Sequence, residues 1–200
     1  MAPATPPSVS ISFALTPSTF SLGDKVQLSA TVVSHASEPI TIFTHLTILN
    51  FYYAQSQARF AYIDLNTDAN CAYMRESCYG YGCVPDRIPG GEYDQYFMTL
   101  MPEQPKVIRG AFEAAQSPTC LSAGNSYRFE WSLHEERISS WWSGVKEKNM
   151  AWRLPFAPVH LKRPSGAPIV LHGFEPLEFR VLPASDANGN MEEDYLPSRA

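Results

Sequence analysis

Short runs in which apolar residues alternate with polar or small ones recur along the chain, and this two-residue period restricts the fold more than any other feature. Residues 9–15 show it first, and residues 26–32 repeat it after a turn at Gly23 and Asp24. Residues 40–49 form a third apolar run after another polar turn. Alternation of this kind is typical of strands that bury one face. Closely spaced repeats separated by turn residues indicate a β-sandwich.

Six later runs have the same character, and they predict further strands. They are residues 59–65, 96–100, 106–112, 127–133, 169–171 and 177–182. Seventeen prolines argue against long helices, because proline lacks an N–H donor and clashes inside a helix. We therefore predict an all-β protein, an antiparallel immunoglobulin-like β-sandwich with long loops and at most one or two short helices. Residues 145–151 favour a short helix, and residues 51–58 favour either a helical turn or a strand end.

The chain of 200 residues is long enough for one sandwich domain. We expect residues 1–7, which are rich in proline, to form a disordered N-terminus, and residues 8–183 to form the single domain. Residues 184–200 hold four acidic side chains against one arginine, and we expect an acidic disordered tail there.

Charge and the N-terminal sequence exclude several partners and locations. The net charge is -5, and no run of Lys and Arg is present that would favour nucleic acid as a partner. The start of the chain lacks the basic and apolar regions of a signal peptide, and no apolar run is long enough to span a membrane. These features predict a cytoplasmic protein with no membrane partner. Cys71, Cys78, Cys83 and Cys120 are then free thiols, whereas secretion would favour a disulfide within residues 71–83.

Two segments resemble known immunoglobulin-like domains. Residues 20–24, 26–32 and 39–42 resemble the opening strands of such domains, and residues 123–129 resemble the approach to a tyrosine corner. The cysteine–tryptophan–cysteine core of antibody domains is missing. The chain is also similar to small uncharacterised intracellular proteins of filamentous fungi, in Trp141-Trp142 and residues 168–171. Both resemblances imply a fold and imply no particular chemistry.

Two local motifs imitate functional sites without completing them. Residues 64–70 match the start of a calcium loop, but Ala69 stands where the loop requires glycine and Arg75 where it requires glutamate. An Asx-rich turn explains these residues better, and we expect no metal site. Ser143 and Lys146 have the spacing of a hydrolase motif whose companion motifs are absent, so we expect Ser143 to cap a helix instead. No nucleotide-binding motif occurs, and we expect no cofactor.

Aromatic residues exceed what a central core needs, and they are the main indication of a ligand site. Tyrosine and tryptophan suit a pocket with apolar walls and a wet rim. The predicted ligand-binding residues are Tyr52, Tyr62, Tyr73, Tyr79, Tyr81, Trp141 and Trp142. His45, Asp64 and Arg75 are the candidate polar or catalytic groups. The alternative is that the aromatics fill the two ends of the sandwich, and that His45 is a core or edge histidine.

Two classes of function remain open, and the sequence leaves undecided whether the chain is an enzyme. The first is a protein that binds a small hydrophobic molecule, such as a cofactor-free fungal biosynthetic cyclase or isomerase of pericyclase type, with residues 79–94 as a lid. The alternative is a non-catalytic immunoglobulin-like adaptor that binds a protein partner. An enclosed cavity would favour the first class, and flat exposed aromatics the second. A secreted disulfide-bonded factor is a third hypothesis, which four free thiols would eliminate.

Overall fold

Strands make up most of the regular structure in the computed structural model, which describes residues 6–71, 93–117, 121–132, 136–149 and 165–183. The protein is all-β, as the alternation predicts. The strands are β1 (Val9–Thr16), β2 (Thr19–Phe20), β3 (Gln27–Ser34), β4 (Ile40–Phe43), β5 (Phe60–Asp64), β6 (Phe97–Leu100), β7 (Lys106–Ala111), β8 (Ser126–Trp131), β9 (Arg137–Ile138), β10 (Trp141–Ser143), β11 (Ile169–His172) and β12 (Leu177–Val181). The helices are α1 (Phe51–Ser56) and α2 (Lys146–Asn149), with 3₁₀ turns η1 (Asp94–Tyr96) and η2 (Glu113–Gln116). None of the described helices is long and apolar enough to cross a membrane.

Three sheets share the strands. Their orders are β7-β3-β1-β11-β9, β2-β12-β8-β5 and β10-β4-β6. Most neighbours are antiparallel, but β1 pairs with β11 in parallel and β2 pairs with β12 in parallel. The antiparallel arrangement that the sequence predicts therefore holds for most pairs but not for these two. Strands joined through a short turn must run antiparallel, whereas β11 and β12 return from the far end of the chain and are free of that restriction.

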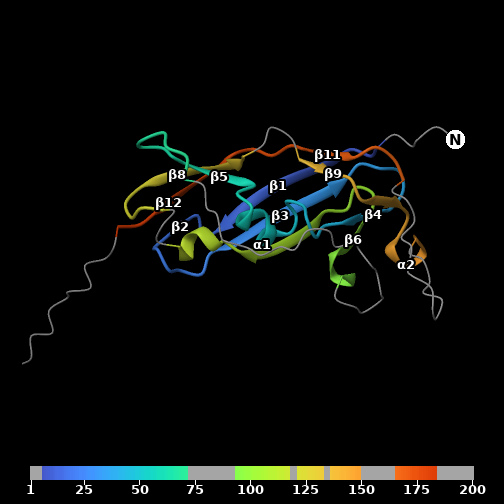
Figure 1. The fold of residues 1–200 in the computed structure, drawn as a ribbon, viewed down its shortest axis with the longest axis horizontal. Coiled ribbons are helices and arrows are strands. Elements are labelled where there is room, and N and C mark those ends of the chain that lie inside the picture. The colour runs from blue at the N-terminus through green and yellow to red at the C-terminus, as the bar shows by residue number, and fades with distance from the viewer. Residues whose placement is uncertain (1–5, 72–92, 118–120, 133–135, 150–164, 184–200) are drawn as a thin grey trace, which may run out of the picture.

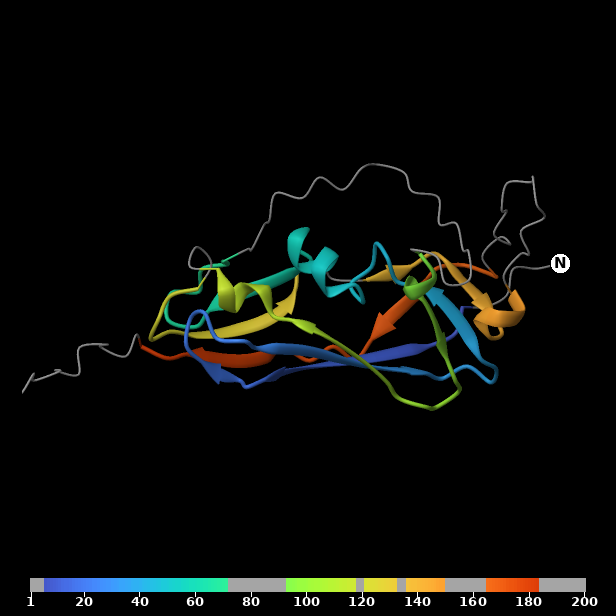
Figure 2. The ribbon, with the colours of Figure 1, turned by 90° about the horizontal axis from the view of Figure 1, so that it is seen from below.

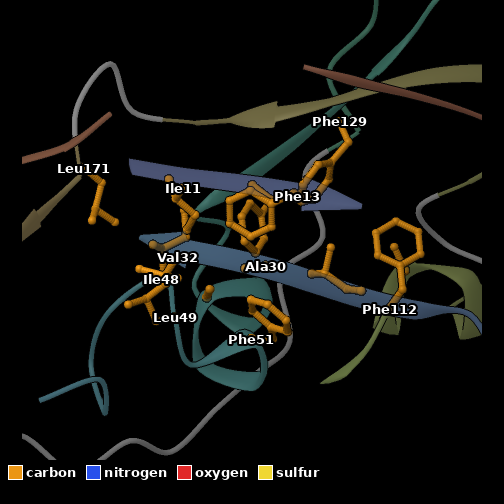
Figure 3. Packing of buried hydrophobic residues seen from close by; sticks show 14 of the residues in the cluster. Ile11, Phe13, Ala30, Val32, Ile48, Leu49, Phe51, Phe112, Phe129 and Leu171 are labelled. Carbon is orange, nitrogen blue, oxygen red and sulfur yellow. The ribbon is translucent and has the colours of Figure 1, made fainter. Parts of the chain in front are cut away.

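The core lies between facing layers of strands. Figure 2 shows β1 and β3 together in one layer, with β5 and β8 across from them. Phe13 of β1 joins the layers, because its ring centroid lies 5.6 Å from that of Phe60 and 5.9 Å from that of Phe129. In Figure 3, Ala30 and other core side chains surround this ring. Aromatic pairs at these spacings add stability beyond the area that they bury.

The third apolar run forms a shorter strand than the sequence predicts. β4 ends at Phe43, and backbone hydrogen bonds from Thr47 N–H to the Thr44 carbonyl and from Asn50 N–H to the Thr47 carbonyl, both of 3.1 Å, form turns. Ile48 and Leu49 are nevertheless buried in the core. The apolar run therefore continues past the strand because a buried turn, rather than a longer strand, fills that part of the core.

Two segments of the chain connect the five-stranded sheet to the three-stranded one, because β3 is followed by β4 and β6 is followed by β7. β3 pairs with β7, and their sequence neighbours β4 and β6 pair with each other, so the two sheets meet at a corner. Figure 1 shows α1 beside β3 in the middle of the molecule and β4 and β6 toward one end. The turn between β6 and β7 holds Glu103 at a φ of 54°, which is unusual for a residue other than glycine. This corner places the groove described next.

Candidate functional site

A groove open to solvent lies between α1, β6 and the outer edge of β7, and we call it the α1–β7 groove. Its volume is about 850 Å³. The turn before α1, residues of β6 and β7 and the start of α2 line it, among them Leu49, Tyr52, Tyr96, Met98 and Ile108. Ligand pockets in proteins commonly have volumes of about 300–1,000 Å³ and mostly apolar walls with a few polar groups. The volume of this groove lies within that range, and its lining mixes apolar with charged side chains.

Close packing of α1 on β7 forms one wall of the groove. Asn50 caps the helix, since its Oδ1 accepts a hydrogen bond from Tyr53 N–H at 3.3 Å. Phe51 then packs against Gly110 of β7, where a Cβ atom would lie only 2.9 Å from Phe51 Cδ2. Glycine at this position lets the buried ring approach the strand backbone. The helix is thereby held against the edge of the sheet.

The side chain of Gln55 takes the place of a neighbouring strand at one end of this edge. It is buried, and its Nε2 donates to the carbonyls of Ala111 at 2.9 Å and Phe51 at 3.1 Å. Its Oε1 accepts from Glu113 N–H at 2.8 Å. A carboxamide has the same donor and acceptor as a peptide group. Gln55 therefore pairs with the edge as one peptide unit of an added strand would.

The rest of the β7 edge has no partner strand among the described residues. Phe112 N–H donates to the Val26 carbonyl at 2.9 Å, so this backbone unit points toward β3. Backbone groups of successive residues point to opposite sides of a strand, which directs those of Ala111, Arg109 and Val107 away from β3. Within the described parts of the chain, no hydrogen bond reaches the backbone of Val107 or Arg109 on that side. A smaller groove of about 360 Å³ shares Gly110 and Ala111 with the first and continues along the same edge.

Charged side chains stand at the rim of the groove. Lys106 and Arg109 of β7 are exposed and make no ion pair with any residue that the structure describes. Lys146 at the start of α2 lies 3.7 Å from Asp94 Oδ2, and its backbone N–H donates to Thr99 Oγ1 at 3.1 Å. These two contacts fix the start of α2 against β6. Lys106 and Arg109 thus place two positive charges at the rim of the groove.

The predicted aromatic residues divide into three groups. Tyr52 of α1 is 47% exposed and lines the α1–β7 groove. Tyr62, Trp141 and Trp142 are buried, which agrees with the alternative that they fill the sandwich. Tyr62 packs between Phe112 and Phe129, and Trp141 Nε1–H donates to the Ala167 carbonyl at 2.8 Å.

The third group lies outside the described residues. It comprises Tyr73, Tyr79, Tyr81 and the candidate anchor Arg75. The same holds for Cys78, Cys83, Cys120 and most of the predicted lid. Cys71 is described, and its thiol donates to the Ala69 carbonyl at 3.9 Å. Burial, and secondarily the Asp64 carboxylate, raise the pKa of this thiol.

His45 and Asp64 belong to separate clusters. His45 follows β4 in a turn rather than lying within a strand, and its ring centroid is 4.4 Å from that of Tyr96. Asp64 ends β5, where Oδ1 accepts from Asn66 N–H at 2.8 Å and Oδ2 accepts from Asn125 Nδ2 at 2.7 Å. The first of these bonds forms an Asx turn, as the sequence predicts. His45 therefore lies near Tyr96, which lines the groove, whereas Asp64 organises a hairpin.

The helix cap predicted for Ser143 is wrong. Ser143 is the last residue of β10, and its hydroxyl donates to Glu38 Oε2 at 3.3 Å. The helix begins three residues later, at Lys146. The serine and lysine of the imitated hydrolase motif thus contact different partners, because the strand continues through Ser143.

Tyr96, Met98 and Gly110 are groove residues that sequence reasoning missed. Met98 was expected only as part of a strand, and no local pattern distinguishes an edge strand that borders a groove from one that another strand covers. The isolated glycine inside an otherwise regular strand was the available signal, because such a glycine often marks a close backbone approach.

No group of acidic, histidine and cysteine side chains suited to hold a metal ion occurs among the described residues. Fold and groove together define the class: an all-β protein with an open groove beside a strand edge that no described strand covers. No protein-family model, curated protein or solved structure matches the chain.

Proposed function

We propose that this chain is an immunoglobulin-like β-sandwich protein that binds a small hydrophobic molecule in the α1–β7 groove. The observation that carries the proposal is the groove itself, which has the volume of a ligand site and apolar walls from Leu49, Met98 and Ile108. Tyr52 and Tyr96 supply rings for stacking and hydroxyl groups for hydrogen bonds at its border.

The immunoglobulin-like assignment is supported by Tyr127. Its hydroxyl accepts a hydrogen bond of 2.7 Å from Ser122 N–H, five residues upstream. A tyrosine near the start of a strand that bonds to the backbone shortly before it is the tyrosine corner of such sandwiches.

A catalytic form of this function is cyclisation or isomerisation without a cofactor. Such reactions depend on holding the substrate in a reactive shape and on a few hydrogen-bond donors. Lys106 and Arg109 are charged donors at the rim, and they would favour a ligand that carries an anionic or polar group at one end. A cytoplasmic location and the resemblance to fungal proteins stay predictions.

Native mass spectrometry of the protein purified from its own host tests ligand binding. We expect a small molecule that remains bound to the native protein and is lost on denaturation. Tyr52→Ala removes a partly exposed ring from the groove, and we expect about tenfold weaker retention, which corresponds to the loss of about 1.4 kcal/mol.

Leu65→Ala is the matched control, because Leu65 is also a partly exposed apolar residue but lies on the hairpin after β5, away from the groove. Equal ligand loss from both variants, or no bound molecule in any of the three proteins, would contradict the proposal.

A second candidate, the adaptor module, is favoured by the open β7 edge at Val107 and Arg109. An extended peptide can add to such an edge as a further strand. Val107→Pro removes one outward N–H without touching the bonds to β3, and we expect it to abolish capture of a protein partner. Ile108→Pro would instead break the β3 pairing and serves as the control for a general loss of fold.

A further inference from the structure

Three polar side chains from distant parts of the sequence meet on the outer face of the five-stranded sheet. Ser10 lies in β1, His35 directly follows β3, and Glu103 lies in the turn between β6 and β7. Ser10 Oγ is 2.9 Å from His35 Nε2. His35 Nδ1 is 3.0 and 3.1 Å from the two carboxylate oxygens of Glu103.

The order of these contacts is that of a nucleophile, a base and a group that orients the base. An ionised carboxylate only accepts hydrogen bonds, so the ring proton of a neutral His35 lies on Nδ1 and points to Glu103. Nε2 then carries the free lone pair, and the Ser10 hydroxyl donates to it. His35 is therefore held in the tautomer that can remove the Ser10 proton.

Backbone hydrogen bonds hold all three residues in place. Ser10 lies in β1, which pairs with β3, and His35 N–H donates to the Ser8 carbonyl at 2.9 Å. Glu103 N–H donates to the Ser34 carbonyl at 2.8 Å. Glu103 keeps a positive φ of 54°, a strained conformation for any residue other than glycine. The turn thus holds a carboxylate beside His35 in a backbone conformation that glycine would adopt with less strain.

The cluster is accessible. The side chains of His35 and Glu103 are 40% and 66% exposed. Gly173 lies next to Ser10, where a Cβ atom would be 3.8 Å from Ser10 Cβ, so no side chain from this position covers the hydroxyl. None of the three residues lines either groove described above.

We propose that Ser10, His35 and Glu103 form a nucleophilic triad that transfers acyl groups from activated esters. Ser10 Oγ attacks the ester carbonyl carbon while its proton moves to His35 Nε2. The bond from that carbon to the leaving oxygen breaks, and Nε2 returns the proton to the leaving group. Water, deprotonated by the same nitrogen, then cleaves the acyl–Ser10 bond and regenerates the hydroxyl.

The open setting defines the substrate class. An exposed sheet face does not exclude water or enclose the reacting carbonyl, so the site has little means to activate a poor leaving group. Esters of acidic alcohols such as phenols need the least activation. This activity is separate from ligand binding in the α1–β7 groove, because the two sites share no residue.

A fluorophosphonate probe tests the triad in the full-length protein. Ser10 Oγ attacks the phosphorus atom, fluoride leaves, and the proton passes to His35. We expect one adduct, which peptide mapping assigns to Ser10 and which Ser10→Ala abolishes. His35→Ala should slow labelling about 10²-fold, the usual contribution of a general base, and Glu103→Gln should slow it less. Hydrolysis of an aryl acetate should follow the same order.

Ser12→Ala is the matched control, because Ser12 lies two residues along the same exposed face of β1 and has no histidine partner among the described residues. It should label like the wild type. Labelling of Ser12 as fast as Ser10, or unchanged labelling in His35→Ala, would overturn the proposal. Ser10→Cys and Ser12→Cys give a second readout that needs no serine chemistry. The thiol at residue 10 should alkylate faster, and equal rates would show that His35 activates nothing.

Discussion

At the scale of single residues, Tyr127 links β8 to the segment that leads into it. The ring is buried and stacks on Phe179 at 5.4 Å between centroids, and its hydroxyl bonds to Ser122 N–H. Gly124 makes the intervening turn with a φ of 91°. One hydroxyl therefore fixes the path of the chain where it enters the strand.

Replacing Tyr127 with phenylalanine tests how much this hydrogen bond contributes to the free energy of unfolding. Tyr127→Phe keeps the ring but leaves the Ser122 N–H without its partner, and we expect a loss of about 1–3 kcal/mol in the free energy of unfolding. Tyr52→Phe, a change at a partly exposed tyrosine, should alter stability by less than about 0.5 kcal/mol. Urea denaturation measures both, and equal effects would show that the Tyr127 bond contributes nothing specific.

The residues of the candidate sites show what sequence reasoning can and cannot reach. The hydrogen bond between Ser122 and Tyr127 joins residues that are close in sequence, so a local pattern can indicate it. Tyr62, Trp141 and Trp142 are buried, and in the sequence an aromatic residue looks the same whether its strand faces the core or a groove. Ser10, His35 and Glu103 lie on three separate segments, so only the register of β1, β3 and the β6–β7 turn brings them together.

At the scale of elements, long alternating strands were predicted well and very short ones were missed. β1, β3, β7 and β8 occupy the predicted runs to within one or two residues at each end. β2 and β9 have only two residues each, too few for any period to appear, and their pairing with β12 and β11 defines them. Tertiary pairing rather than local pattern therefore determines the shortest strands.

The contact between α1 and β7 gives a prediction at this scale. Gly110→Ala places a methyl group 2.9 Å from Phe51 Cδ2, which is too close for an unchanged ring. We expect overpacking to destabilise the protein by about 1–3 kcal/mol, measured by thermal or urea unfolding. Adding Phe51→Leu should recover part of the loss, because the smaller side chain gives the methyl group room.

Additive effects of Gly110→Ala and Phe51→Leu in a double-mutant cycle would contradict this explanation. Gly23→Ala is an informative control. Gly23 also requires glycine, but through its φ of 93°, and a Cβ there meets no atom within 4 Å. The loss of stability caused by Gly23→Ala should therefore be the same whether residue 51 is Phe or Leu.

At the scale of the whole molecule, Glu136 contacts two segments that are distant from it in the sequence. Its carboxylate lies 3.4 Å from Arg59 Nη1, and its backbone carbonyl accepts from Leu171 N–H at 3.0 Å. Burial raises the pKa of this carboxyl above its usual value of 4.5, against the lowering effect of Arg59 and of the Arg137 backbone N–H. The folded protein thus keeps the Glu136 proton to a higher pH than the unfolded chain does.

This shift has a definite sign in the pH dependence of stability. Between the ordinary pKa and the raised one, the folded state binds more protons, so the contribution of Glu136 falls as pH rises through that window. We expect Glu136→Gln to gain stability relative to the wild type as the pH rises above the ordinary pKa of a glutamate carboxyl. Urea midpoints across this range measure the difference, with Glu178→Gln at an exposed site of β12 as control. A difference that shrinks as pH rises would contradict the prediction.

The places of β11 and β12 have a consequence for biosynthesis. β11 lies between β1 and β9, and β12 lies between β2 and β8, so the last two described strands are inner members of two sheets. A ribosome releases each of these strands after the strands with which it pairs. Until then β1 and β2 each have an edge with unpaired backbone groups, and such an edge can pair with another chain. A stalled chain that ends before residue 169 is therefore a candidate for aggregation rather than a partly folded intermediate.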